Sequence, residues 1–326
     1  MSTEFDGILF IGDPHVSSKR IGRRKDDYTT SVLAKLSACA TLCRDNNLMP
    51  IILGDLFHRS YDNGLSMLNR LVRVLKEFQV PPLVLEGNHD KGQTSLSDDD
   101  ALQLLALTGI IDVILVAGAV GTLRIAGQDV MLHAVPYGSD IPDFVAEQPG
   151  VPQLMITHHD LAFGRTYPGA LPLKPIANID MVVNGHMHDT KPSAVFAGTH
   201  WNNPGNIEPL SVDLADHLPR AWSWRPGQAF DQLSPHDLPH GTDLFDLTGI
   251  QVEASDADEA VKHVLATSGF ATLLQSESSL DAQKTDDASV LGADLETVLG
   301  AASASDAVAT LLRAMMSQVA QAAQAT

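Results

Sequence analysis

Short apolar runs recur along the first two thirds of the chain, and several of them end in a turn that contains glycine or a polar residue. Each run has five to seven residues, mostly Ile, Leu and Val, which is typical of strands buried on both faces. The runs span residues 7–12, 50–54, 82–87, 112–118, 153–157 and 181–185. Between the early runs, apolar residues recur at helical spacing over 27–44 and 65–78. This alternation predicts an α/β layered fold.

Two further strand-like runs, over 122–126 and 129–134, flank Gly127-Gln128 and predict a hairpin. Since a hairpin joins antiparallel strands, whereas helical crossovers join parallel ones, we expect mixed sheets.

The pattern changes near residue 210. Alternation over 221–230 predicts a hairpin that carries Trp222 and Trp224 on one face, and the segment 243–274 is typical of a small α+β unit. Helical spacing returns in the tail. We therefore divide the chain into a core domain, a small C-terminal α+β cap or accessory region and a helical tail, over residues 1–210, 211–275 and 276–326.

The chain is acidic, with 40 Asp and Glu against 21 Lys and Arg and a net charge of -19. Residues 211–326 hold 17 acidic and 5 basic residues, whereas residues 1–210 hold 23 and 16. A mean field of this sign repels polyanions, which excludes a general nucleic-acid coat or a membrane-surface binder. A local site for an anion stays open, because metal ions or a basic patch reverse the sign.

Several features indicate the cellular compartment. The two cysteines, Cys39 and Cys43, are too few for a disulfide scaffold, and their spacing in a helical pattern predicts buried, reduced thiols. The first residues show no basic segment of a signal peptide. The longest apolar tract, over 101–123, is interrupted by polar residues and glycines, so we expect no membrane span. We predict a cytoplasmic protein.

Polar side chains follow five of the predicted strands, close to the points where these strands end. The five groups are Asp13-Pro14-His15, Asp55-Leu56-Phe57-His58, Asn88-His89-Asp90, His158-His159-Asp160 and His186-Met187-His188. In an open α/β sheet, ligands bind at the carboxyl ends of the strands. Carboxylate, amide oxygen and imidazole together suit Mn, Fe or Zn. The set is large enough for two ions, which at roughly 3.5–4 Å apart can hold the attacking and leaving oxygens of a phosphate ester.

Each group alone has a simpler explanation. Asp or Asn after glycine, as in Gly54-Asp55 or Gly87-Asn88, is common in turns. Five groups in one order, each after a strand, are not explained by turn formation, so we retain the metal-site hypothesis.

The series DxH, GDxxH, GNHD, HH and GHxH, over about residues 7–210, resembles the motifs of the calcineurin-like metallophosphoesterase superfamily. The second motif, Gly54-Asp55-Leu56-Phe57-His58, and the turn Asn202–Asn206 are similar to the SbcD-type DNA double-strand-break repair nuclease branch. Protein phosphatases of the superfamily carry GDxxDRG instead. The resemblance implies an α/β-β/α sandwich with mixed sheets, with residues 1–210 as the catalytic domain.

The resemblance also implies two divalent metal ions, manganese first, with Fe, Zn or Mg as alternatives. The ligands of the first ion would be Asp13, His15 and His188. The ligands of the second ion would be Asn88, His158 and His186. Asp55 would bridge both ions.

Three further residues receive roles from the resemblance. His89 would be the general acid or transition-state stabiliser beside the leaving oxygen, with Asp90 orienting it. His58 matches the second histidine of the nuclease branch, near the metals but not on them. In the fourth motif, His158 directly follows the strand, and His159 stays the alternative ligand.

Basic residues gather after the first motif, where Lys19-Arg20-x-x-Arg23-Arg24-Lys25 holds five bases within seven residues. This segment is either a contact to the DNA backbone, made by Arg23 and Arg24, or a solvated loop. Arg165, in a loop after His159, either touches the scissile strand or faces solvent.

The apolar stripe over 306–323 either packs on its own domain or docks a partner. In the resembling branch, a C-terminal helical segment binds the coiled-coil base of an SMC-like (SbcC-type) ATPase. We therefore predict DNA as substrate and such an ATPase as partner, with a homodimer left open.

The function predicted from these observations is a dinuclear metal-dependent phosphodiesterase, acting as a DNA exonuclease or endonuclease in double-strand-break repair or recombination. The alternative is a stand-alone phosphodiesterase on cyclic nucleotides or other small phosphodiesters. A degenerate scaffold is disfavoured because the ligand set is intact.

Overall fold

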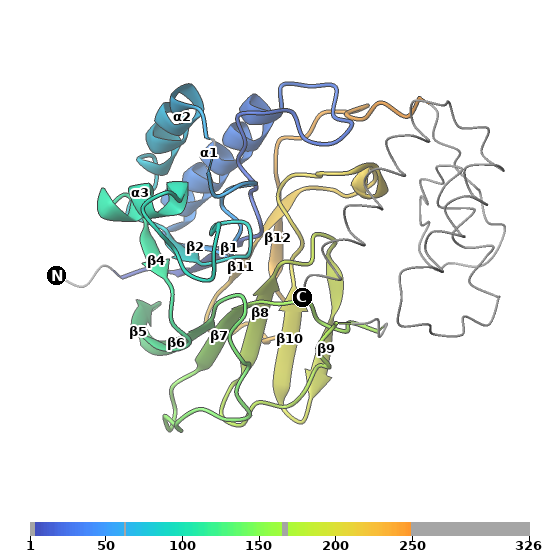
Figure 1. The fold of residues 1–326 in the computed structure, drawn as a ribbon. Helices are drawn as coiled ribbons and strands as arrows, with labels where there is room; N and C mark the ends of the chain where they lie inside the picture. The colour runs from blue at the N-terminus through green and yellow to red at the C-terminus, as the bar shows by residue number, and fades with distance from the viewer. Residues whose placement is uncertain (1–3, 62, 165–168, 249–326) are drawn as a thin grey trace, which may run out of the picture. The chain divides into compact units, whose positions relative to one another are not determined.

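We analysed a computed structural model of the chain, which describes residues 4–61, 63–164 and 169–248 (Figure 1). Contacts within the chain separate a compact unit, Met1–Asp246, from a second unit, Leu247–Thr326. The first unit contains two six-stranded sheets that pack face to face. The predicted helices of the tail lie outside the described residues.

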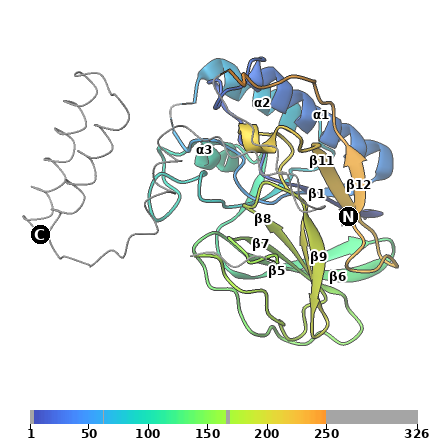
Figure 2. The same cartoon turned by 90° about the vertical axis from the view of Figure 1, so that its right-hand side faces the viewer.

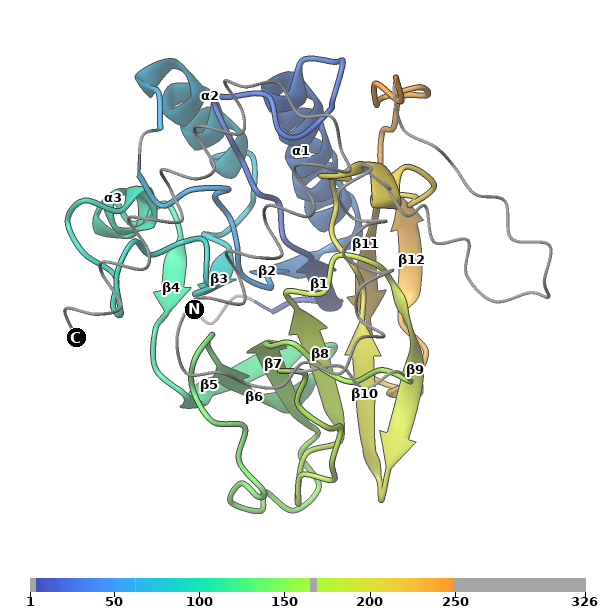
Figure 3. The same cartoon turned by 45° about the vertical axis from the view of Figure 1, so that its right-hand side comes forward.

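The first sheet has the strand order β12-β11-β1-β2-β3-β4. Strands β1 to β4 are parallel, and β11 and β12 extend the sheet as an antiparallel pair. The strands are β1 (Gly7–Ile11), β2 (Leu48–Ile52), β3 (Leu83–Leu85), β4 (Asp112–Ile114), β11 (Arg220–Trp224) and β12 (Ser234–Asp237). Helices α1 (Tyr28–Asn46), α2 (Leu65–Leu75) and α3 (Ala101–Leu107) cover the outer face of this sheet (Figures 1 and 3).

The second sheet has the strand order β5-β6-β7-β8-β10-β9. Its four central strands are parallel, and β5 and β9 pair antiparallel at its two edges. The strands are β5 (Gly118–Ile125), β6 (Gln128–Val135), β7 (Gln153–His158), β8 (Met181–Gly185), β9 (Lys191–Phe196) and β10 (Thr199–Asn203). A 3-10 turn, η1 (Val212–Leu214), precedes β11. Both sheets are mixed, which confirms the predicted fold class.

Three apolar layers hold the first unit together. One lies between the helices and the first sheet, and a second lies between the two sheets, where Phe10 and Ile156 are fully buried. The third lies on the outer face of the second sheet around Trp201. Irregular segments form this outer cover, since the described residues of 136–152 and 159–180 contain no helix. The α/β-β/α arrangement therefore has helices on one outer face only, within the described residues.

Local sequence explains where α1 begins and ends. The Asp27 carboxylate accepts the Thr30 N–H at 3.1 Å and caps the amino end. At the other end, Asn47 takes the left-handed conformation, with φ 49°, that commonly closes a helix. Cys39 and Cys43 lie on the buried side of this helix as free thiols. Helix α2 begins at the predicted residue and ends at Leu75, before the predicted limit at 78.

A hairpin follows residue 210, but its second strand lies at 234–237, beyond the predicted limit at residue 230, and the hairpin joins the first sheet. Strand β11 pairs antiparallel with β1, with Trp224 opposite Ile8, and β12 pairs with β11 (Figure 2). Trp224 is buried in the layer between the sheets. The part of the predicted accessory region up to Asp246 is therefore part of the first unit, because β11 pairs with the free edge of β1.

None of the described helices has the length and apolar character that crossing a bilayer requires.

Candidate metal centre

The five polar groups predicted from the sequence meet at one place, between the carboxyl ends of the central strands of both sheets. Strands β1, β2 and β3 carry the first three groups, and β7 and β8 carry the last two. Among the described residues, three sets of side chains there present ligand atoms within 4.8 Å of one another. His15, His58 and His89 form one of them, and the two others contain Asp55. One of these two is His15, Asp55 and His188, and the other is Asp55, His158 and His186. Asp55 belongs to both.

The same Asp55 oxygen faces a histidine of each set. Oδ2 of Asp55 lies 3.5 Å from Nε2 of His15 and 3.3 Å from Nε2 of His158. The Nε2 atoms of His15 and His188 lie 3.0 Å apart. Because one carboxylate oxygen lies between two imidazole clusters, Asp55 has the position of a bridge between two ions.

Asn88 and Asp13 complete the pocket. Oδ1 of Asn88 lies 3.2 Å from Nε2 of His158 and 3.0 Å from Nδ1 of His186. Oδ1 of Asp13 accepts the backbone N–H of His186 at 3.1 Å and lies 3.5 Å from Nδ1 of His158. All seven predicted ligands therefore lie in one pocket.

The residues fit divalent cations. Oδ2 of Asp13 and Nδ1 of His15 are buried and make no hydrogen bond. Carboxylates and neutral imidazoles that converge in this way leave lone pairs unmatched, and a cation satisfies them. The mixture of carboxylate, amide and imidazole donors suits Mn, Fe or Zn. When bound, two such ions polarise a phosphoryl oxygen and lower the pKa of water.

Electrostatics keep two of the histidines in the ligating form. Burial lowers the pKa of His186 and of His188 to about 4, so both rings are neutral near pH 7. Burial, with the nearby charge of Asp55, raises the pKa of Asp13 to about 7 although His158 opposes the shift. A buried carboxyl that is hard to ionise is expected where a matching cation belongs.

His158 and Asp55 form an ion pair. Burial lowers the pKa of His158, but the charges of Asp55 and Asp13 raise it to about 9. Burial raises the pKa of Asp55, and the charge of His158 holds it below its usual range. A bound cation competes with the His158 proton for the same carboxylate, so metal binding releases protons.

A hydrogen bond from His158 to the main chain fixes which ring nitrogen faces the pocket. Nδ1 of His158 donates to the Leu53 carbonyl at 2.8 Å, so Nε2 faces Asp55 and would become the ligand atom once its proton is released. Gly54 makes this approach possible, because a Cβ there would lie 2.2 Å from that Nδ1. Gly87 has the same role beside Asp55, with a Cβ at 2.2 Å from Oδ1.

His159 points away from the pocket. Its Nε2 lies 2.8 Å from the Ser139 carbonyl, and its backbone N–H donates to Asn184 at 3.0 Å. Since neighbouring residues at the end of a strand face opposite sides, only one of the two histidines can reach the metal ligands. The structure brings His158 into the ligand set and not His159.

The backbone at the pocket is strained. Asp13, His15, Asp55 and His186 have positive φ angles of 31°, 47°, 48° and 72°. Residues with a Cβ rarely take this conformation, and such residues gather at functional sites. The strain places side chains from successive turns into one small volume.

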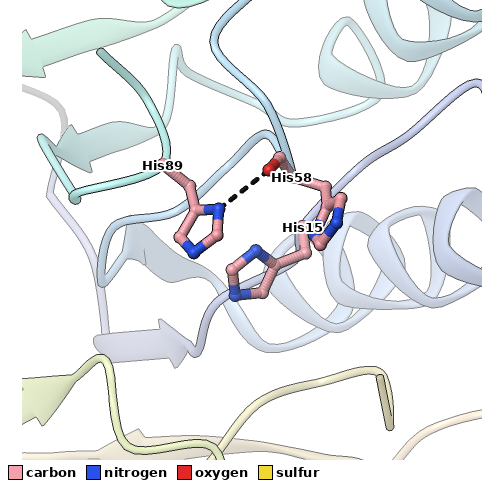
Figure 4. Close-up of side chains that lie close together, drawn as sticks. All are labelled: His15, His58 and His89. Carbon is pink, nitrogen blue, oxygen red and sulfur yellow. Dashed lines mark hydrogen bonds between the residues drawn. The ribbon is translucent and has the colours of Figure 1, made fainter. Parts of the chain in front are cut away.

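His58 and His89 lie beside His15, and ring nitrogens of the three residues lie within 4.8 Å of one another (Figure 4). The two rings are nearly parallel, with an interplanar angle of 23° and centroids 5.5 Å apart. The His89 centroid lies 4.9 Å from that of His15. Nδ1 of His89 lies 2.8 Å from the His58 carbonyl and donates to it, which leaves Nε2 of His89 open toward the pocket.

The predicted partner of His89 is wrong. Asp90 accepts the backbone N–H groups of Phe57 at 3.1 Å and Gly87 at 3.0 Å, and the ring of His89 bonds to His58. Asp90 therefore holds together the loops after β2 and β3. Burial and the charge of Asp55 raise its pKa to about 7.

A sequence profile described as calcineurin-like phosphoesterase matches residues 7–190, the segment that carries every predicted metal ligand. The chain belongs to the calcineurin-like phosphoesterase family. It is therefore a metal-dependent phosphoesterase, and the superfamily predicted from its motifs is confirmed. The SbcD-type branch stays a prediction.

Other comparisons add little to this family assignment. The protein is similar to a hypothetical protein from Thermus thermophilus, with a TM-score of 0.41 and 14% identity. The match covers 72% of this chain and 100% of that one. No curated protein matches the chain.

This phosphoesterase does not offer Arg24 to a substrate. Arg24 is fully buried and pairs with Asp26 and Glu208, and its guanidinium also donates to the Pro209 carbonyl at 2.7 Å. The predicted DNA contact by Arg24 is wrong, because a buried and paired guanidinium cannot reach a phosphate. Arg23 is exposed. Arg165 lies outside the described residues.

Sequence reasoning missed Asn184, which forms hydrogen bonds to the chain on both sides of His158. Its Oδ1 accepts the Thr157 hydroxyl at 2.7 Å and the His159 N–H at 3.0 Å. Its Nδ2 donates to Oδ1 of Asn203 at 2.9 Å and so links three strands. A buried polar residue inside the apolar run of β8 was the available signal, because such residues need partners.

Proposed function

We propose that this calcineurin-like phosphoesterase is a manganese-dependent DNA nuclease, an exonuclease or endonuclease that acts in double-strand-break repair or recombination. The observation that carries the proposal is the pair of stacked imidazoles, His58 and His89, beside the first ligand set. Asp55 and the six other ligands would hold two Mn²⁺ ions.

The pair gives the pocket a donor for a leaving oxygen. Breaking a phosphodiester leaves an alkoxide that is unstable without a hydrogen-bond donor or an ion. Nδ1 of His89 donates to the His58 carbonyl, so Nε2 faces the pocket, and as the second N–H of an imidazolium it would donate to the leaving oxygen. His58 occupies the end of the second motif, where protein phosphatases of the superfamily carry Asp and Arg. The resemblance to the nuclease branch therefore rests on a residue in the pocket.

Exposed basic side chains beside the first motif would contact the DNA. Lys19, Arg20 and Arg23 are exposed and follow the first metal ligands in sequence. Phosphate contacts of this kind supply affinity without sequence preference. The double-strand-break branch also works with an SMC-like ATPase, so we propose such a partner, and with it a cytoplasmic location. Deleting residues 303–326 should abolish co-purification with that ATPase and spare manganese-dependent hydrolysis.

A second candidate is a stand-alone phosphodiesterase on cyclic nucleotides or other small phosphodiesters. The basic segment favours this second candidate, because two of its five basic residues are not available to DNA. Arg24 is buried, and Lys25 pairs with Asp243 at 2.5 Å. A net charge of -19 also disfavours a long polyanion.

One experiment separates the two candidates. Purified protein with Mn²⁺ is assayed on linear duplex DNA and on bis-p-nitrophenyl phosphate, with Asp55→Ala as the inactive control. A nuclease degrades DNA and loses this activity in His89→Ala while keeping its bound metal. Hydrolysis of the small diester without any cleavage of DNA would support the second candidate and overturn the nuclease.

A further inference from the structure

A cavity of about 820 Å³ opens beside the metal ligands, between the segment after β3 and the turn after β6. Its wall includes Glu86, Lys91, Leu96, Leu115 and Tyr137. Cavities of about 300–1,000 Å³ commonly hold small molecules or parts of larger ones. None of the seven metal ligands lines this cavity, so the metal centre alone does not account for it.

Tyr137 connects the cavity to the metal ligands. Its ring centroid lies 5.6 Å from that of His186 and 6.2 Å from that of His158. The Tyr137 side chain remains 39% exposed although it touches the rings of two buried or half-buried ligands. One end of the ring therefore meets the second ligand set while the rest faces the cavity.

Two main-chain contacts hold Tyr137 in place. Its N–H donates to the Glu86 carbonyl at 3.2 Å, and its own carbonyl accepts from Nζ of Lys91 at 3.4 Å. Tyr137 is thus attached to the end of β3, whose next turn carries Asn88. An aromatic ring held in advance costs less ordering when a ligand stacks on it.

The charges in the cavity wall cancel. Nζ of Lys91 lies 2.7 Å from Oε2 of Glu86, and the side chains of both are largely buried. Leu96 and Leu115 supply apolar surface. Gln93, Thr94, Ser95 and Ser139 add uncharged polar groups to the wall. A cavity with one compensated ion pair, uncharged polar and apolar walls and an exposed aromatic ring suits a neutral, flat group better than a phosphate.

We infer that this cavity is the subsite for the nucleobase next to the scissile phosphate, with Tyr137 as the ring on which that base stacks. The inference rests on the proposed function, because it takes a nucleic acid or nucleotide ester as the substrate. Stacking on one aromatic side chain contributes enough affinity that its loss should raise KM by about 10-fold.

The test compares two esters with the same leaving group. Thymidine 5′-(p-nitrophenyl phosphate) carries a base, and methyl p-nitrophenyl phosphate does not. The variants are Tyr137→Ala and Tyr137→Phe, with Phe144→Ala as a matched control at an aromatic that is 72% exposed and does not line the cavity. Bound Mn²⁺ is measured for each protein.

We expect Tyr137→Ala to raise KM for the thymidine ester by about 10-fold. For the methyl ester, kcat and KM should both stay unchanged. Tyr137→Phe and Phe144→Ala should behave like the wild type. Equal losses on both esters, or loss of bound Mn²⁺, would show that Tyr137 only supports His158 and His186. An unchanged KM, or a wild type that does not prefer the thymidine ester, would also overturn the subsite. If the wild type prefers the thymidine ester but does not cleave DNA, the proposed nuclease function is wrong and the proposed nucleobase subsite is still supported.

Discussion

Two buried polar clusters lie close together in the first unit, and they differ in whether their charges are paired. The cluster around Arg24 holds two cations, Arg24 and Lys35, and two anions, Asp26 and Glu208. Lys35 donates to Glu208 at 2.8 Å, and the Arg24 guanidinium donates to Asp26 at 2.6 and 2.7 Å. Each charge meets an opposite charge within the chain.

The metal-ligand cluster has no such balance. Oδ2 of Asp13 and Nδ1 of His15 are buried without a hydrogen bond, and His15 and His188 turn ring nitrogens toward each other. Both clusters hold fully buried charged or polar side chains, such as Arg24 and Glu208 in one and Asp13 and His15 in the other, and pairing separates them. A buried polar cluster is structural when every charge and polar atom in it has a partner within the chain. A cluster in which buried polar atoms have no such partner can bind an ion.

The two clusters are linked through α1. The Arg24 guanidinium lies 5.3 Å from the centre of the Tyr28 ring, and the Tyr28 hydroxyl donates to the His15 carbonyl at 3.0 Å. The paired cluster thus supports the strained loop that carries the first ligands.

Replacing Asp55 should have the largest effect. Loss of an outer partner of a metal site costs 10–100-fold in affinity or activity, and Asp55 belongs to both ligand sets, so Asp55→Ala should lower kcat/KM by at least about 1,000-fold. Mn²⁺ should raise the melting temperature of the wild type and not that of the variant. Calorimetry with and without metal checks this, and an equal metal-induced rise in both proteins would contradict the bridging position.

Replacing Glu208 should affect stability instead. Glu208→Ala leaves the buried charge of Lys35 without its anion and leaves Arg24 with Asp26 alone, and breaking a buried pair in this way typically costs about 3–5 kcal/mol of unfolding free energy. Urea unfolding without metal measures this. The exposed pair of Asp129 and Arg124 is the control, and Asp129→Ala should cost less than about 1 kcal/mol. A loss of Mn²⁺ binding in folded Glu208→Ala, with no loss of stability, would break the distinction between the clusters.

His89→Ala should lower kcat by about 100-fold or more, since a positioned proton donor contributes at least that much. Its ring nitrogen lies within 4.8 Å of those of His15 and His58, but His89 is not one of the seven proposed ligands, so the bound metal should stay the same. Metal analysis beside steady-state kinetics checks the prediction. If the variant loses its metal, His89 is a ligand and not a donor to the leaving oxygen.

His158→Ala and His159→Ala test which neighbour completes the second set. His158→Ala should weaken metal binding by more than about 10-fold, and His159→Ala should have a much smaller effect. Titration of the metal-free proteins with Mn²⁺ gives the comparison. The reverse order would contradict the position of His158 beside Asp55 and Asn88.

Arg23→Ala should have the smallest effect. If Arg23 contacts a DNA phosphate, its loss lowers the slope of log K against log salt by about 1 without changing sequence preference. Arg24→Ala should instead lower stability, because Arg24 belongs to the paired cluster. DNA binding measured at several salt concentrations distinguishes Arg23→Ala from Arg24→Ala. If the slope of log K against log salt is unchanged in Arg23→Ala, Arg23 does not contact a DNA phosphate.

The predictions from sequence succeeded where the signal is local. Apolar runs and helical spacing placed the strands β1, β2, β7 and β8 and the helix α1, because both periods depend on neighbouring residues alone. The ligand candidates followed from the polar residues at the ends of those strands. Their meeting in one pocket follows from parallel strands, whose carboxyl ends share an edge.

The sequence by itself determined the layered fold class, the family and the set of candidate ligands. The tertiary structure decided which of His158 and His159 faces the pocket and which group orients His89. It also decided that Arg24 is buried and that β11 completes the first sheet. Each of these depends on a partner that is distant in sequence, as Glu208 is from Arg24 by 184 positions. Burial and pairing arise only when such segments meet, so no local pattern can report them.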